Sequence, residues 1–315
     1  MVRYISKRIA QSILVLFLVS IVIYGLMYMM PGDPVYAVYG TNLKPGQYEE
    51  KYIEMGLDKP VYERYAKWLG GVFQGNLGSS TKYHMPVATL IKARLPVTLY
   101  IGGWSILLGT IIGVVLGIIC AMHARKMTDN ILTVLANIGC AVPDFWIAVI
   151  LVAIFSTTLG LLPSFGFSFP WENGFADSFK HLVMPVIAMT VGTASITTRQ
   201  TRASIVEVQE MEFVRATRAK GCKESKVMVR HIFRNALIPI VTHIGLMFPV
   251  IIAGAVTIER IFAIPGMGDL MVTGVLNQDT AVVQACILIL AASICLANLI
   301  VDIVYCIVDP RIKLQ

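Results

Sequence analysis

The sequence predicts an all-α integral membrane protein with six transmembrane helices and both termini in the cytoplasm. Of its 315 residues, 56% are hydrophobic and only 14% are charged, whereas a soluble domain carries about 25% charged residues. Apolar runs of about 20 residues, the length that crosses a bilayer core as a helix, recur along the chain. Lys and Arg gather beside alternate ends of these runs, as basic residues do when they set topology. The net charge of +7 therefore indicates a lipid bilayer as the surroundings and no nucleic acid as a partner.

The first apolar run predicts a retained membrane span. Residues 1–30 form a cytoplasmic N-terminus and this span, at 9–30. Three basic residues hold its start in the cytoplasm: Arg3, Lys7 and Arg8. The run is too long for a signal peptide, and the sequence MPGDP follows it in place of a small-x-small cleavage site.

Residues 31–96 predict an extended segment on the outer side of the membrane. Basic and acidic residues nearly balance here, and Gly and Pro are frequent. A short helix is expected after Pro60, because four apolar side chains are spaced for one face: Val61, Tyr65, Trp68 and Leu69. Since Trp and Tyr favour the headgroup level, we expect this helix to lie at the membrane surface.

Residues 97–308 form the membrane core, and residues 309–315 form a basic cytoplasmic tail. The expected spans of the core are 97–121, 131–155, 182–198, 236–257 and 281–308. The loops at 156–181 and 258–280 hold few basic residues, so we expect them outside. The fourth span is short and rich in Thr and Ser, which predicts that it faces protein or a water-filled path rather than lipid.

Two features inside the core favour specific contacts. Gly109, Gly113 and Gly117 recur every four residues in the second span, and such a stripe lets another helix approach closely. The alternative is that these glycines are merely tolerated. Asp144 lies beside Pro143 in the third span, where a carboxylate is costly unless it faces protein or water. It is either a pathway residue or a structural residue with a local hydrogen bond.

The longest polar interruption of the core is residues 199–235, between the fourth and fifth spans. Its nine basic residues are Arg199, Arg202, Arg215, Arg218, Lys220, Lys223, Lys226, Arg230 and Arg234. The segment from Glu207 to Lys220 favours a helix that ends at Gly221, a residue typical of a helix C-terminus. A second helical run from Lys223 to Arg234 leads into the fifth span. Small residues at the turn leave room for a partner surface. The alternative is a topogenic loop on anionic lipid.

The chain lacks the motifs of known catalytic and metal sites. It contains no G-x-x-x-x-G-K-[ST], no H-E-x-x-H and no G-x-S-x-G. Its six cysteines include no C-x-x-C, and its five histidines have no ligand spacing. We therefore predict no enzyme, no catalytic residue, no metal and no cofactor in this chain.

The run FVRATRAKGCKESKVMVRHIFRNALIP, at 213–239, resembles the EAA-type coupling loop of ABC-importer permeases, especially their peptide/nickel branch. Further motifs similar to that branch span nearly the whole chain. They are PGDP at 31–34, GLDKPVYERY at 56–65, N-L-G-x-S at 76–80, R-L-P-x-T at 94–98, E-x-I-F-x-I-P-G-x-G at 259–268 and DPRIKL at 309–314. Their order and the long first outer segment resemble the B-type permease of dipeptide/oligopeptide importers rather than its C-type partner.

This resemblance implies a permease that imports di- or oligopeptides as a heterodimer with a C-type permease. Two cytoplasmic ABC ATPases would supply the energy, and an extracytoplasmic solute-binding protein would deliver the solute. The resemblance places ATPase coupling in a cytoplasmic coupling helix, at Phe213, Val214, Arg215, Ala216, Arg218, Ala219, Lys220 and Gly221. There Arg215, Arg218 and Lys220 would pair with acidic groups or lipid phosphate. Binding-protein contact would involve Asp33, Ile264, Pro265, Gly266, Met267, Gly268 and Asp269, and Asp144 is the candidate for the translocation path.

The chain departs from the family pattern at two points. Arg215, Ala216 and Thr217 stand where the general consensus has Glu-Ala-Ala, and Asp144 stands where the branch has a small polar residue. Nickel, glutathione or another small solute is an alternative to peptide. A secondary transporter without ATPases is a rival hypothesis, as is a membrane enzyme that uses Asp144 and His243.

Overall fold

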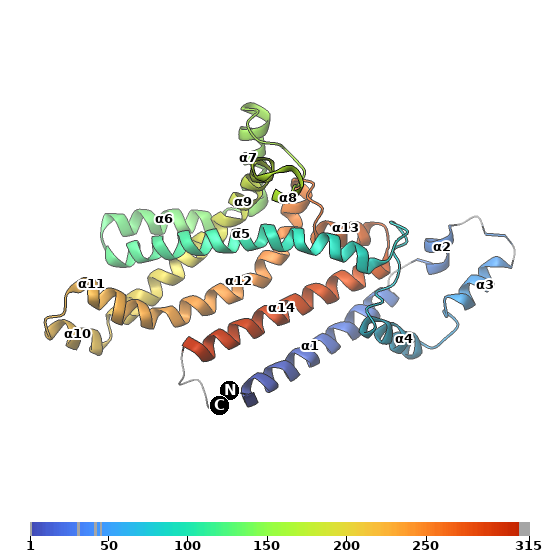
Figure 1. Ribbon diagram of the computed structural model, residues 1–315, viewed down its shortest axis with the longest axis horizontal. Helices are drawn as coiled ribbons and strands as arrows, with labels where there is room; N and C mark the ends of the chain where they lie inside the picture. The colour runs from blue at the N-terminus through green and yellow to red at the C-terminus, as the bar shows by residue number, and fades with distance from the viewer. Residues whose placement is uncertain (1, 30–31, 41–42, 45, 309–315) are drawn as a thin grey trace. The chain divides into compact units, whose positions relative to one another are not determined.

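The computed structural model of this chain is built of helices and describes residues 2–29, 32–40, 43–44 and 46–308. In chain order the helices are α1 (Val2–Met29), α2 (Pro34–Tyr39), α3 (Gln47–Glu54), α4 (Val61–Phe73), α5 (Val87–Met122), α6 (Met127–Ala141), α7 (Asp144–Leu151), η1 (Val152–Thr158), α8 (Pro170–Asn173), α9 (Phe175–Gln209), α10 (Glu212–Ala219), α11 (Glu224–Lys226), η2 (Val227–Phe233), α12 (Arg234–Ile261), α13 (Met267–Leu276) and α14 (Thr280–Val308) (Figure 1). The helices η1 and η2 are π-helical. The predicted tail at 309–315 and Pro31 of the PGDP motif lie outside the described residues.

The chain divides into two compact units. Unit 1 consists of residues 1–6, 98–264 and 296–315, and unit 2 consists of residues 7–97 and 265–295. The stretch at 199–235 and Asp144 lie in unit 1.

Four helices are long and apolar enough to cross a membrane within the described residues: Ile5–Met29, Val87–Met122, Phe175–Gln209 and Thr280–Ile303. Met127–Ala141 and Asp144–Thr158 add a fifth span if the bent pair counts as one. The protein is thus a helical, multi-pass membrane protein, as predicted. Of the six predicted spans, the remaining one at 236–257 coincides with α12, whose side chains at 248–254 are not described.

The third predicted span is broken at Pro143. The helices on either side are bent by 93°, because proline has no amide hydrogen and its ring clashes with the preceding turn. Asp144 is the first residue after the break.

The fourth predicted span, 182–198, lies within a much longer helix, α9 (Phe175–Gln209). The helix α9 has 35 residues, about 50 Å at 1.5 Å per residue, and therefore reaches well beyond a bilayer core. Hydropathy misses the ends of this helix because they carry charged residues, such as Lys180 and Arg202. Its middle is rich in Thr and Ser. Those side chains are buried against protein, including Thr193, Thr197 and Thr201, so the expectation that this span faces protein is confirmed.

The glycine stripe of α5 packs on these threonines. A methyl group added at Gly109 would lie 2.7 Å from a side-chain carbon of Thr193. At Gly113 or Gly117 it would lie 2.5 Å from the Cβ atom of Thr197 or Thr201. Because real Cβ atoms do not approach so closely, the close-packed helix pair predicted from the stripe is confirmed.

Unit 2 contains the predicted helix after Pro60, which is α4. Tyr65 and Trp68 of this helix pack on Tyr24 of α1, with ring centroids 5.4 and 5.5 Å from it. The core of the unit joins the first turns of α5 to α13 and α14 through eight buried residues: Val87, Leu90, Ile91, Met267, Leu270, Val282, Ala285 and Cys286.

Candidate functional site

The polar stretch between α9 and α12 contains the later part of the predicted helix as α10, whereas Glu207 still belongs to α9 and a turn at 210–211 separates the two helices. Helix α10 begins after Met211 with Glu212 in its first turn and ends with Arg218 in its last, charges that oppose the helix dipole at each end. Gly221 follows with φ of 76°, the left-handed conformation that glycine adopts without strain. The predicted second helical run is also present, as α11 and η2 leading into α12.

One side chain fixes α10 to the membrane helices. Val214 is fully buried and belongs to a core cluster that draws on the ends of four helices. The other members are Ala121 of α5, Ile205 and Val208 of α9, Val227 and Ile232 of η2, and Ala236 and Ile240 of α12. Val214 therefore packs α10 against the ends of α5, α9 and α12.

All of the predicted coupling residues except Val214 are exposed. Phe213 keeps 39% of its surface accessible, and at least partial exposure extends over the rest of the set: Arg215, Ala216, Arg218, Ala219, Lys220 and Gly221. The exposed set presents an aromatic ring, small residues and positive charge on one short helix and its turn.

Arg218 closes the turn around Gly221. Its guanidinium donates two hydrogen bonds to the carboxylate of Glu224, at 3.1 Å from Nε and 2.5 Å from Nη2. This pairing holds the pKa of Glu224 below its ordinary value and raises the pKa of Arg218. Arg218 thus has an acidic partner within the chain.

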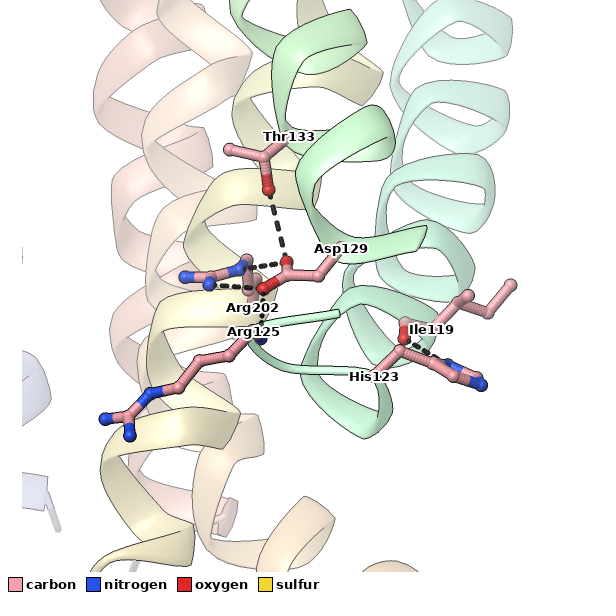
Figure 2. A network of polar contacts seen from close by, with 6 residues as sticks. All are labelled: Ile119, His123, Arg125, Asp129, Thr133 and Arg202. Atoms are coloured by element: carbon pink, nitrogen blue, oxygen red, sulfur yellow. Dashed lines mark hydrogen bonds and ion pairs between the residues drawn. The ribbon is translucent and has the colours of Figure 1, made fainter. Parts of the chain in front are cut away.

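Next to this region, a second ion pair joins α6 to α9 (Figure 2). Arg202 donates to both carboxylate oxygens of Asp129, at 2.6 Å from Nε and 2.7 Å from Nη2. The backbone N–H of Arg125 at 3.0 Å and the hydroxyl of Thr133 at 3.3 Å complete the shell. The Asp129 side chain is only 2% exposed. Arg202 lies one turn before Ile205, so the pair connects α6 to the helix that leads into α10.

Asp144 lies in a cavity of about 230 Å³ at the break between α6 and α7. The cavity is lined by the end of α6, the start of α7, the middle of α9 and Met247 of α12. Gly192 of α9 leaves room for the carboxylate, since a Cβ there would lie 3.1 Å from Oδ1. His243, its predicted partner in a membrane enzyme, does not line this cavity.

The sequence matches two family models. Residues 113–314 match the "Binding-protein-dependent transport system inner membrane component", and residues 1–102 match the corresponding N-terminal model. The chain belongs to this family. It is a permease of the ABC-importer class, and its family is not itself catalytic.

Curated relatives match this permease over nearly their full length. A "Putative peptide transport system permease protein" of Brucella abortus is 36% identical over 99% of both chains. The "Oligopeptide transport system permease protein AppB" of Bacillus subtilis is 36% identical, over 99% of this permease and 100% of the relative. The "Glutathione transport system permease protein GsiC" of Escherichia coli is 34% identical over 99% of both.

Among solved structures, a chain of the inward-facing MetNI methionine ABC transporter has the same fold. It aligns with a TM-score of 0.58 over 70% of the permease and 96% of that chain, at 17% identity.

The residues predicted to meet a binding protein have different local surroundings. Asp33 caps α2 through the N–H of Val35 at 2.8 Å and also accepts the hydroxyl of Tyr48 at 2.6 Å. The Tyr48 contact lowers the pKa of Asp33 and raises the pKa of Tyr48 to about 12. Asp33 thus links the N-terminus of α2 to Tyr48 of α3.

Much of the second predicted segment is buried. Ile264 and Met267 are 1% and 0% exposed, and Gly266 and Gly268 are buried as well. Pro265 and Asp269 are partly exposed, and Asp269 lies 3.7 Å from a guanidinium nitrogen of Arg94. In the isolated permease, only these two residues of the segment offer a partly exposed side chain.

Sequence reasoning missed three polar links between distant segments. The first link is the ion pair of Asp129 and Arg202, for which the sequence shows only that both charges lie near the ends of predicted spans. Thr98 donates to the buried Glu259 at 2.5 Å, and Ser80 donates to the buried Asp279 at 2.5 Å. Thr98, Glu259 and Ser80 all lie in the quoted family motifs, so these residues were visible in the sequence but their pairing was not.

Proposed function

We propose that this permease is the B-type transmembrane subunit of an ATP-driven importer of di- and oligopeptides. A C-type permease completes the pathway as a heterodimeric partner. Two cytoplasmic ABC ATPases hydrolyse ATP, and an external solute-binding protein delivers the peptide. The rival secondary transporter needs no ATPase, so co-purification of ATPase subunits with the permease separates the two hypotheses.

The observation that carries the proposal is the exposed helix α10 on a buried anchor. A coupling element must offer an accessible surface and must also transmit its displacement. Phe213, Arg215, Ala216, Ala219 and Lys220 supply the accessible surface. Val214 joins this surface to the ends of α5, α9 and α12. We therefore assign Val214 as an anchor and the exposed residues as the ATPase contact.

The proposal of a peptide substrate rests on the names of the relatives. AppB is named for oligopeptides, GsiC for glutathione, which is a tripeptide, and the Brucella relative for peptides. A solute with peptide groups is common to all three. Glutathione is the alternative substrate within this class.

Topology follows from the same proposal. Six spans result if α12 crosses the membrane together with the four long helices and the bent pair. Both termini and α10 then lie in the cytoplasm, whereas residues 31–96 and Pro265 and Asp269 face the binding protein. Alkaline phosphatase fused within 31–96 should be active, and the same fusion after Gly221 should be inactive.

The decisive experiment changes Gly221 in the assembled importer. We expect Gly221→Arg to leave the complex assembled but to abolish peptide-stimulated ATP hydrolysis and peptide uptake, because bulk and backbone strain fall at the contact. Gly221→Asn should retain most activity, since Asn tolerates the left-handed conformation.

A matched control is Gly160→Arg. Gly160 has φ of 62°, and no atom lies within 4 Å of a Cβ added there, as at Gly221. It lies in the loop predicted to be outside, so the same strain and the same added charge should leave coupling intact. Unchanged uptake in Gly221→Arg, or equal loss in both variants, would contradict the assignment of α10.

A further inference from the structure

The break in the third span leaves acceptors without donors. Pro143 has no amide hydrogen, so the carbonyl of Gly139 lacks the partner that a continuous helix supplies. The end of α6 is also the negative end of its helix dipole. In membrane proteins, interrupted helices of this kind line cavities and hold ions or charged groups of the solute.

The Asp144 carboxylate lies at this break and has no partner in the described part of the chain. Neither a hydrogen bond nor an ion pair reaches it there, although the side chain is half-buried. The nearby hydroxyl of Thr193 donates to the carbonyl of Met189 instead, at 3.0 Å. Residues 244–256 of α12 are all apolar in sequence, so this neighbouring segment holds no polar side chain.

Asp144 is the one charged residue among those that line the cavity. A carboxylate at membrane depth is retained when it serves a pathway or a partner. The cavity of about 230 Å³ exceeds the roughly 30 Å³ share of one water molecule several-fold. It therefore has room for a charged group of a solute but not for a whole oligopeptide.

The chemistry of the lining selects a monovalent cation that donates hydrogen bonds. The carboxylate of Asp144 and the open carbonyl of Gly139 are acceptors, and the carbonyl lies at the negative C-terminal end of α6, whereas Asp144 is the first residue of α7. A divalent metal needs more ligands than these two groups supply. Within the described part of the chain, no three His, Cys, Asp or Glu side chains are grouped so that they could hold a metal ion. A primary ammonium group meets both requirements, because it carries one positive charge and can donate three hydrogen bonds to such acceptors.

We propose that Asp144 and the open end of α6 form a docking point for the ammonium group of the transported solute. The inference rests on the proposed function, because a peptide carries such a group at its amino terminus, whose pKa of about 8 keeps it charged at neutral pH. Asp144 holds this end of the peptide during passage, and the variable side chains remain outside the cavity.

The test measures binding of trialanine to the detergent-solubilised importer without its binding protein. Saturation-transfer NMR reports contact with the first residue of the peptide. We expect contact with the wild-type complex, and a dissociation constant raised at least tenfold in Asp144→Asn or with N-acetyl-trialanine. Gly192→Ala keeps the charge but crowds the carboxylate, and should give an intermediate loss.

The control is Asp58→Asn, which removes an exposed carboxylate in the outer segment and should bind trialanine as the wild type does. Equal binding of trialanine and its N-acetyl form, or unchanged binding in Asp144→Asn, would overturn the docking point. Peptide uptake by the wild-type importer tests the proposed function separately. Uptake in the wild type combined with unchanged binding in Asp144→Asn would refute this inference alone.

Discussion

Two carboxylates at the two ends of α6 have opposite surroundings. Asp129, in the first turn, receives two bonds from Arg202, one from the backbone of Arg125 and one from Thr133. Asp144, just past the last turn, lies in a cavity beside Gly192, and no hydrogen bond to it is found in the described structure. Removing one partner of a buried ion pair is strongly destabilising, whereas a buried carboxylate without a partner lowers stability and persists for another reason. The contrast is consistent with a structural role for Asp129 and with the role proposed above for Asp144.

The largest expected effect is at Asp129. Asp129→Asn leaves the charge of Arg202 without its partner, and we expect a loss of about 3 kcal/mol, the lower end for a broken buried pair because Arg202 is partly exposed. This should lower the thermal midpoint of the detergent-solubilised complex by roughly 5–10 °C.

The double variant Asp129→Asn/Arg202→Gln provides the control. It removes both charges and should regain part of the lost thermal stability. If Asp129→Asn alone were as stable as the wild type, the ion pair would contribute nothing to stability. Asp129 would then not differ from Asp144 in this respect.

A smaller effect of opposite sign is expected at Asp144. Asp144→Asn removes an unpaired carboxylate from a half-buried place, and we expect a gain of about 1 kcal/mol, seen as a higher thermal midpoint. Peptide uptake should fall in the same variant. A marked loss of stability would mean that Asp144 has a structural partner, which would make it equivalent to Asp129.

The smallest effect is expected at a third acid, Glu224, whose pair with Arg218 is exposed. Glu224→Gln should cost no more than about 0.5 kcal/mol at neutral pH. Arg218 depresses the pKa of Glu224 in the folded chain, so the contribution is present above the ordinary value of 4.5 and is lost as pH falls through the lowered pKa.

The pH dependence of Glu224→Gln gives the check. The difference in thermal midpoint between this variant and the wild type should shrink as pH falls below 4.5 and through the lowered pKa of Glu224. A difference that is independent of pH would mean that charge pairing is not its cause.

The sequence was sufficient for what depends on local pattern. Apolar runs located the long helices, Pro60 marked the start of α4, and Gly221 marked the end of α10. The stripe of Gly109, Gly113 and Gly117 predicted a close helix pair, because a helix face without side chains lets a neighbouring backbone approach.

Contacts between distant residues were not predictable from one sequence. Asp129 and Arg202 are 73 positions apart, and nothing in their spacing links them. The full length of α9 was not predicted because charged residues, such as Lys180 and Arg202, lower the hydropathy of its ends. The motif alone places Val214 among the contact residues, and only packing distinguishes the buried face of an eight-residue helix from its exposed face.

Anchoring by a single valine determines which movements α10 transmits. Moving the helix away from the membrane helices would expose Val214, a loss of about 1.5–3 kcal/mol for a side chain of this size. Rotating the helix about that side chain keeps it buried and costs far less. For the proposed coupling role, we therefore expect α10 to transmit displacement toward or away from the membrane helices more strongly than a change of its angle.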